Sequence, residues 1–139
     1  MKILATLTLI VTSLIFLMNN STAGNGNRSV KSTTTIVRIW RGWTTPENAI
    51  KLERALREEA IPGIEANKPT GLNGIQLLTV ENGKEVQFTT IMYFDSIESV
   101  KAFAGENYRK AHIDPSVAPL LLSYDQMVEH HTLKESKNW

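Results

Sequence analysis

Residues 86–112 read VQFTTIMYFDSIESVKAFAGENYRKAH and predict a strand that runs directly into a helix. Every second position from Val86 to Phe94 is apolar except Thr90, and this period of two is typical of a strand. Asp95 then stands where a carboxylate can accept the free amides of a helix start, with Glu98 three residues later completing a capping box. One face of the expected helix carries its apolar residues, Ile97, Val100, Phe103 and Ala104.

A second unit of the same kind lies earlier in the chain. The alternating residues 35–43 predict a strand, and Thr45 and Pro46 follow as an N-cap and a first helical residue. We expect this first helix to end at Pro62-Gly63, because proline cannot continue a helical hydrogen-bond ladder.

The remaining segments complete a six-element order. Residues 73–80 and 85–94 predict two strands joined by a hairpin turn, 81–84, in which Asn82-Gly83 supplies positive φ angles. Residues 107–112 and 115–121 predict short helical pieces, and 123–133 predicts the last strand. The order β-α-β-β-α-β is typical of the ferredoxin-like α+β fold, a four-stranded antiparallel sheet with both helices on one face.

The face of the sheet without helices must also be covered, because the strands offer it apolar side chains. We assign Ile36, Trp40, Ile91 and Tyr93 to that face. The sequence therefore predicts a homodimer in which two sheets face each other and enclose a cavity.

The first 33 residues do not read as part of this fold. Residues 1–23 combine a short basic start, an apolar run and a small-residue site, which predicts a cleaved signal peptide. The alternative is a retained membrane anchor, although the apolar run is short for a span. Residues 24–33 predict a disordered linker, 34–133 the domain and 134–139 a polar tail. We therefore expect an exported protein, periplasmic or secreted, without stable membrane insertion after cleavage.

Composition excludes several classes of function. Removal of Lys2 with the signal leaves 14 basic residues against 14 acidic ones, without a basic stripe, which argues against nucleic acid as a partner. The chain has no cysteine, so thiolate catalysis and thiolate metal sites are excluded. No two-histidine metal motif, phosphate loop or nucleotide fingerprint is present, and we predict no metal and no nicotinamide or flavin cofactor.

With this order of elements, residues 34–133 resemble the antibiotic biosynthesis monooxygenase family of dimeric α/β barrels. The resemblance rests on residues 37–44, VRIWRGWT, before the first helix, and on Phe94-Asp95-Ser96 leading to Phe103-Ala104-Gly105-Glu106. Val128-Glu129-His130 near the end completes it. The resemblance implies the dimeric barrel fold and a small, largely apolar or aromatic ligand.

For activity, the resemblance implies a monooxygenase that oxidises a small phenolic compound without a cofactor. Such a reaction needs a water-poor cavity and one or two polar groups that stabilise an anion. The expected catalytic residues are Arg38, Tyr93 and His130, and the expected substrate-binding residues are Ile36, Trp40, Ile91 and His112. The alternative reading of these residues is structural: the aromatics form dimer core, and Arg38 pairs with an acid such as Glu129.

Two other functions stay open. Residues 108–112, YRKAH, are similar to the stretch that carries the axial histidine in haem-degrading members, so His112 is a candidate haem ligand. Two further positions used by those members, an Asn on the first strand and a Trp on the second helix, are not matched here. The third possibility is a non-catalytic ligand-binding or stress module that keeps the fold and has lost the chemistry.

Overall fold

The computed structural model describes residues 34–139, so the expected signal peptide, 1–23, and linker, 24–33, lie outside the described residues. The elements are, in order, β1 (Ile36–Thr44), α1 (Pro46–Ala55), the π-helical turn η1 (Leu56–Ala60), α2 (Ile61–Ala66), β2 (Leu72–Asn82), β3 (Glu85–Phe94), α3 (Ile97–Ala104), the 3-10 turn η2 (Ala118–Leu120), β4 (Ser123–Tyr124) and β5 (Glu129–Thr132).

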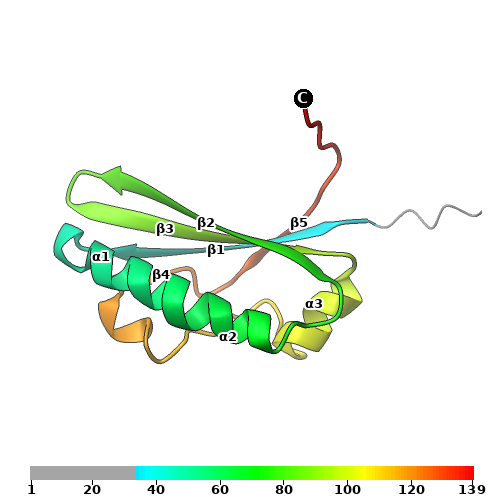
Figure 1. Ribbon diagram of the computed structural model, residues 1–139, viewed down its shortest axis with the longest axis horizontal. Helices are drawn as coiled ribbons and strands as arrows, with labels where there is room; N and C mark the ends of the chain where they lie inside the picture. Colours follow the sequence, from blue (N-terminus) through cyan, green and yellow to red (C-terminus); the bar gives the residue numbers. More distant parts are fainter. Residues whose placement is uncertain (1–33) are drawn as a thin grey trace, which may run out of the picture. The chain divides into compact units, whose positions relative to one another are not determined.

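The strands form one antiparallel sheet in the order β2-β3-β1, with β4 and β5 both paired to the remaining edge of β1. Figure 1 shows α1, α2 and α3 together on one side of this sheet. The predicted ferredoxin-like α+β plan, with both helical regions on one face, is confirmed. None of the helices within residues 34–139 is long and apolar enough to cross a membrane.

The pairing of β1 with β3 decides which side chains face the helices. Arg38 stands opposite Met92 and Trp40 opposite Thr90, and Trp40 belongs to the same buried cluster as Leu52 of α1. Ile36 packs on the cluster around Met92, on the same side. The assignment of Ile36 and Trp40 to the helix-free face is therefore wrong, whereas Ile91 and Tyr93 do lie there, opposite Ile39 and Val37.

The first helical region is longer than the sequence predicts. Thr45 caps it as expected, and its hydroxyl oxygen accepts the amide hydrogen of Asn48 at 3.2 Å. The helix does not end at Pro62-Gly63 but runs through them to Ala66. The π-helical turn η1 ends at Ala60, two residues before Pro62, and its wider hydrogen-bonding pattern accommodates a residue that has no amide hydrogen to donate.

The start of α3 and the β2–β3 hairpin differ in detail from the sequence prediction. The N-cap of α3 is Ser96, whose hydroxyl accepts from the Ser99 amide at 3.1 Å, so the predicted Asp95–Glu98 capping box is wrong by one residue. The Asp95 carboxylate instead accepts the hydroxyl of Ser99 at 2.6 Å. In the β2–β3 hairpin, Asn82 is the last strand residue and Gly83 alone has a positive φ, 67°.

The segment after α3 differs most from expectation. Residues 107–112 are not helical: the backbones of Arg109 and Ala111 bond those of Val128 and Gln126 at 2.6 and 2.9 Å. This pairing splits the expected strand 123–133 into β4 and β5. The 3-10 turn η2 lies within the expected piece 115–121, and the buried Thr44 hydroxyl donates to the Leu120 carbonyl at 2.6 Å. The loop before β4 is thereby tied to the end of β1.

Candidate functional site

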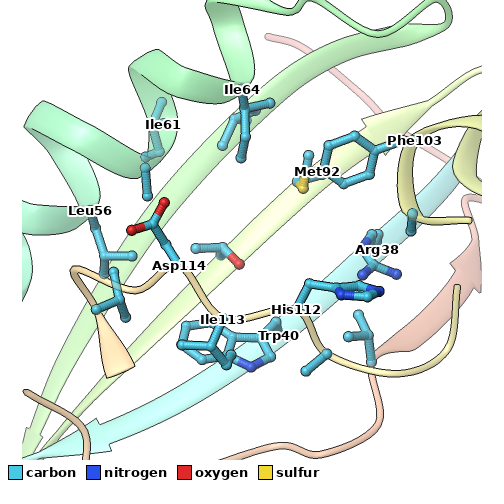
Figure 2. A pocket seen from close by; sticks show the side chains of 17 residues that line it. Arg38, Trp40, Leu56, Ile61, Ile64, Met92, Phe103, His112, Ile113 and Asp114 are labelled. Atoms are coloured by element: carbon cyan, nitrogen blue, oxygen red, sulfur yellow. The ribbon is translucent and has the colours of Figure 1, made fainter. Parts of the chain in front are cut away.

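A cavity of about 470 Å³ lies between the sheet and the helical layer of one chain. It is therefore not the space between two facing sheets that the sequence predicts. Its wall is largely apolar, with side chains from β1, β2, β3, η1, α2 and α3 and from the segments that follow α3. Figure 2 labels ten of the residues that line it, Arg38, Trp40, Leu56, Ile61, Ile64, Met92, Phe103, His112, Ile113 and Asp114.

Arg38 is the charged group most deeply placed in this wall. It is 7% exposed, and its Nη1 donates to the Tyr108 carbonyl oxygen at 2.6 Å. Its guanidinium carbon lies 6.0 Å from the centre of the Phe103 ring. Within residues 34–139 no carboxylate pairs with it, and burial lowers its pKa to about 10. The group is still charged at neutral pH, in a position where an anion would stabilise it.

His130 holds Arg38 from the side of β5. Its Nε2 lies 2.9 Å from Nη1 of Arg38, and because a guanidinium only donates, Nε2 must accept. Burial, followed by the positive charges of Arg38 and Arg109, lowers the His130 pKa to about 4, so the ring is neutral at pH 7. Its acceptor nitrogen is occupied by Arg38, which makes His130 a positioning residue for the guanidinium and not a free base.

Trp40 forms part of the cavity wall beside Arg38 on β1. A side chain at Gly42 would come within 2.7 Å of the Trp40 ring and 2.8 Å of Leu121, so glycine allows the indole to lie over the strand. Trp40 is 8% exposed, and its Nε1 is buried without a hydrogen-bond partner in the described part of the chain. An unsatisfied donor of this kind costs about 1–3 kcal/mol.

His112 and Asp114 reach the cavity from the loop that follows α3. The pairing of residues 109–111 with 126–128 places this loop against the cavity, so that residues 111–114 form part of its wall. Figure 2 shows the His112 ring beside Arg38, whereas the Asp114 carboxylate points toward Leu56 and Ile61. One Asp114 oxygen, Oδ1, accepts the amide and the hydroxyl of Ser116 at 2.8 and 2.6 Å, and these bonds hold the Asp114 pKa below its ordinary value.

The structure thus brings together three of the predicted site residues, Arg38, Trp40 and His112, with His130 directly behind Arg38. It separates Tyr93 and Ile91, which lie on the other face of the sheet, where the Tyr93 hydroxyl donates to Gln76 at 3.0 Å. Ile36 packs under α3 and does not line the cavity.

Sequence reasoning missed Asp114 and most of the apolar wall. Asp114-Pro115-Ser116 has the composition of an ordinary turn, and nothing local indicates that its carboxylate meets a cavity. The wall residue Ile64 lies in α2 beyond Pro62-Gly63, where the sequence predicts that the helix ends.

Comparison with known proteins supports the fold. No protein-family model matches the sequence, and none of the curated proteins matches it. A structure of a candidate antibiotic biosynthesis monooxygenase from Bacillus cereus superimposes with a TM-score of 0.55 at 12% identity, covering 76% of this chain and 99% of that one. At this identity the likeness shows a shared fold, and that fold is of the antibiotic biosynthesis monooxygenase type.

Two other solved structures are similar over the same share of the chain, 76%. Rv0793 from Mycobacterium tuberculosis is 18% identical, is covered over 98% of its length and gives a TM-score of 0.46. A candidate antibiotic biosynthesis monooxygenase from Chloroflexus aurantiacus J-10-fl is 21% identical, is covered over 97% and gives a TM-score of 0.36.

Proposed function

We propose that the protein binds a small, largely apolar phenolic molecule in the cavity and oxidises it with molecular oxygen, without a cofactor. The observation that carries this proposal is Arg38, a buried cation in an apolar wall with no carboxylate partner among residues 34–139. A buried guanidinium without a counter-ion is unfavourable, and a ligand anion would offset that cost. The charge is thus placed where it favours the ionised form of a bound hydroxyl.

The rest of the cavity fits such a ligand. Its volume of about 470 Å³ lies within the ordinary range for small-molecule sites, and Met92, Ile64 and Phe103 give it apolar surface. In the proposed reaction, His112 takes the phenolic proton and Arg38 stabilises the phenolate. The phenolate passes electrons to oxygen, one oxygen atom enters the ring and the other leaves as water, so that a phenol with a free ring position gives a quinone. The fold shared with the Bacillus cereus protein supports this class of reaction.

Two matched variants test the proposal. Arg38→Gln removes the charge in the cavity, and Arg41→Gln removes the same charge from the other face of β1, where Arg41 pairs with Asp125 and Glu129. Binding of a series of alkylphenols is measured by calorimetry at a pH near the pKa of the phenol, and oxygen uptake with an oxygen electrode. We expect Arg38→Gln to weaken binding about tenfold or more and to abolish uptake, because it removes a charge-assisted hydrogen bond. Arg41→Gln should leave both unchanged.

The two readouts separate the alternatives. Phenol binding that depends on Arg38 without oxygen uptake would replace the oxygenase by a non-catalytic ligand-binding module. Equal binding by both variants would contradict a role for Arg38, and the proposal would fail.

Haem binding is a second candidate, favoured by the His112 ring that lines the cavity. If haem binds, His112 would hold its iron and Arg38 could pair with a propionate; haem would then supply oxygen activation. Stoichiometric haem titration followed by the Soret band tests this, with His112→Ala compared with His131→Ala on the opposite face. A spectral shift lost only in His112→Ala supports haem binding, and a shift indifferent to both substitutions contradicts it.

We also propose that two chains associate through the helix-free face of the sheet. Val37, Ile39, Ile91 and Tyr93 lie on this face, and Leu78 of β2 is 47% exposed beside them. Sedimentation of the wild type and of Leu78→Glu tests the dimer: the charge should lower the association constant, and a monomeric wild type would contradict it.

Export is a further proposal. Mass determination of the mature N-terminus after expression in a secreting host would test it, and cleavage after Ala23 is expected.

A further inference from the structure

We infer that the ligand is bipolar: its acidic hydroxyl meets Arg38, and a hydrogen-bond donor or cation at its other end meets Asp114. This inference rests on the proposed function, because it concerns the same cavity, and it specifies the class of substrate. The observation that supports it is that the buried cation Arg38 and the carboxylate of Asp114 lie on separate parts of one apolar cavity wall.

The two charged groups lie apart, with apolar side chains between them. In Figure 2, Arg38 and His112 stand together near Phe103, while Asp114 lies on the side of Leu56 and Ile61. They form no ion pair with each other. A compact phenol would therefore reach Arg38 and leave Asp114 unused, whereas an elongated ligand could meet both ends.

The orientation and hydrogen bonding of the Asp114 carboxylate suit this contact. Ser116 donates to Oδ1 through both its amide and its hydroxyl, which fixes the orientation of the carboxylate. The second oxygen, Oδ2, takes part in none of the hydrogen bonds found within residues 34–139. A fixed carboxylate with one oxygen available favours a donor or a cation over an acceptor or an anion.

Asp114 also marks where the cavity meets the surface. A second, more polar hollow of about 770 Å³ shares Ala60, Ile64, Phe103 and Asp114 with the cavity and continues to Asn67, Lys68 and Thr70. Lys68 carries the opposite charge, but it is exposed, and it lines the outer hollow and not the cavity. A ligand tail leaving the cavity therefore reaches Asp114 before Lys68, and Asp114 sets the preferred charge.

Three phenols with the same chain length at the para position test this inference, one ending in a methyl group, one in an ammonium group and one in a carboxylate. Their dissociation constants are measured for the wild type, Asp114→Asn and Lys68→Gln. Asp114→Asn keeps the Oδ1 acceptor for Ser116 and removes only the charge. We expect the wild type to bind the ammonium-ended phenol about three- to fivefold more tightly than the methyl-ended one, as for a partly exposed ion pair, and the carboxylate-ended one least. Asp114→Asn should erase this order, and Lys68→Gln should keep it.

The outcomes distinguish this inference from the function on which it rests. If all three phenols bind through Arg38 with no dependence on the tail, or if the preference survives Asp114→Asn, the bipolar ligand is overturned and the phenol site stands. A preference for the carboxylate tail that disappears in Lys68→Gln would also overturn it, since Lys68 would then select the tail. If none of the phenols binds the wild type, the proposed function fails and this inference fails with it.

Discussion

Two arginines three residues apart on β1 have opposite surroundings. Arg41 faces the helix-free side, where its Nη1 lies 3.1 Å from Asp125 and 2.9 Å from Glu129 and its side chain is 30% exposed. Arg38 faces the helices, where it is 7% exposed and bonds a carbonyl and a neutral imidazole. The strand therefore carries one arginine that is paired with carboxylates and one that has no carboxylate partner among residues 34–139.

The pKa values of the surrounding groups follow this difference. The hydrogen bond with Glu129 raises the Arg41 pKa, and the hydrogen bond from Arg41 lowers that of Glu129 to about 2. Burial lowers the Arg38 pKa to about 10 and the His130 pKa to about 4. Binding sites commonly contain polar groups in unfavourable surroundings, because a ligand can supply the hydrogen-bond or ion-pair partner that the fold does not provide.

The largest expected difference between the two faces concerns Phe94 and Tyr93. Phe94 is fully buried, with its ring 5.6 Å from that of Phe103, and Tyr93 is half-buried on the other face. We expect Phe94→Ala to lower the free energy of unfolding by about 3–5 kcal/mol, because it removes apolar contact and leaves a cavity. Tyr93→Ala should cost clearly less in the monomer. Urea unfolding at low protein concentration measures both.

The concentration dependence of the same measurement adds a control. If the helix-free faces associate, the loss in free energy of unfolding caused by Tyr93→Ala should grow with protein concentration. The loss caused by Phe94→Ala should stay the same. A cost for Tyr93→Ala as large as that for Phe94→Ala at every concentration would mean that the core does not lie only on the helix side.

Much of the fold could be predicted because local signals are strong along β3 and at the helix starts. Alternation from Val86 to Phe94 and the Thr45-Pro46 cap both agree with the structure. The face of β1 could not be predicted in the same way, since Val37 and Ile39 are as apolar as Ile36 and Trp40. Only the register with β3 decides between the two faces, and register is not a local property.

The site was accessible to sequence reasoning only where one residue is chemically unusual. Arg38 stands out as a charge within an apolar strand, and His112 stands out through its sequence context. Asp114 does not stand out, because Asp-Pro-Ser is an ordinary turn and its carboxylate enters the cavity through the pairing of residues 109–111 with 126–128. That pairing also split a strand predicted as continuous.

His130 allows a pH test of the arrangement around Arg38. Its pKa is about 4 in the folded protein and about 6.5 in the unfolded chain, so the unfolded chain binds more protons between these values. Stability should therefore be complete above pH 6.5 and fall as the pH approaches 4. Allowing for partial solvent screening, we expect a contribution of about 1–2 kcal/mol. His130→Gln, which keeps an acceptor for Arg38, should reduce the stability difference between pH 7 and 4.5 by this amount.

The matched control for His130 is His131→Gln, on the opposite face and 2.7 Å from Glu129. Urea unfolding at both pH values is measured for each variant. An unchanged pH dependence in His130→Gln would show that His130 is not held neutral by its surroundings.

A smaller effect is expected for Arg41→Gln. Its two carboxylate partners are partly exposed, and exposed ion pairs contribute at most about 1 kcal/mol. We expect a slight loss of stability in low salt that nearly disappears in 1 M sodium chloride, where the Debye length is about 3 Å. Urea midpoints at the two salt concentrations measure it, and a loss that is independent of salt would indicate packing of the side chain instead of charge.

The smallest net effect on stability is expected for Arg38→Met, the substitution at the most buried charge. Methionine relieves the burial of a cation that has no counter-ion in the described part of the chain, which favours the folded state. The same change leaves Nε2 of His130 and the carbonyl of Tyr108 without their donor, which opposes it. These effects nearly cancel, so the free energy of unfolding should change by less than about 1 kcal/mol while phenol binding is lost. A loss above about 3 kcal/mol in urea unfolding would mean that Arg38 holds the fold together, and that the two arginines of β1 do not differ in the way proposed.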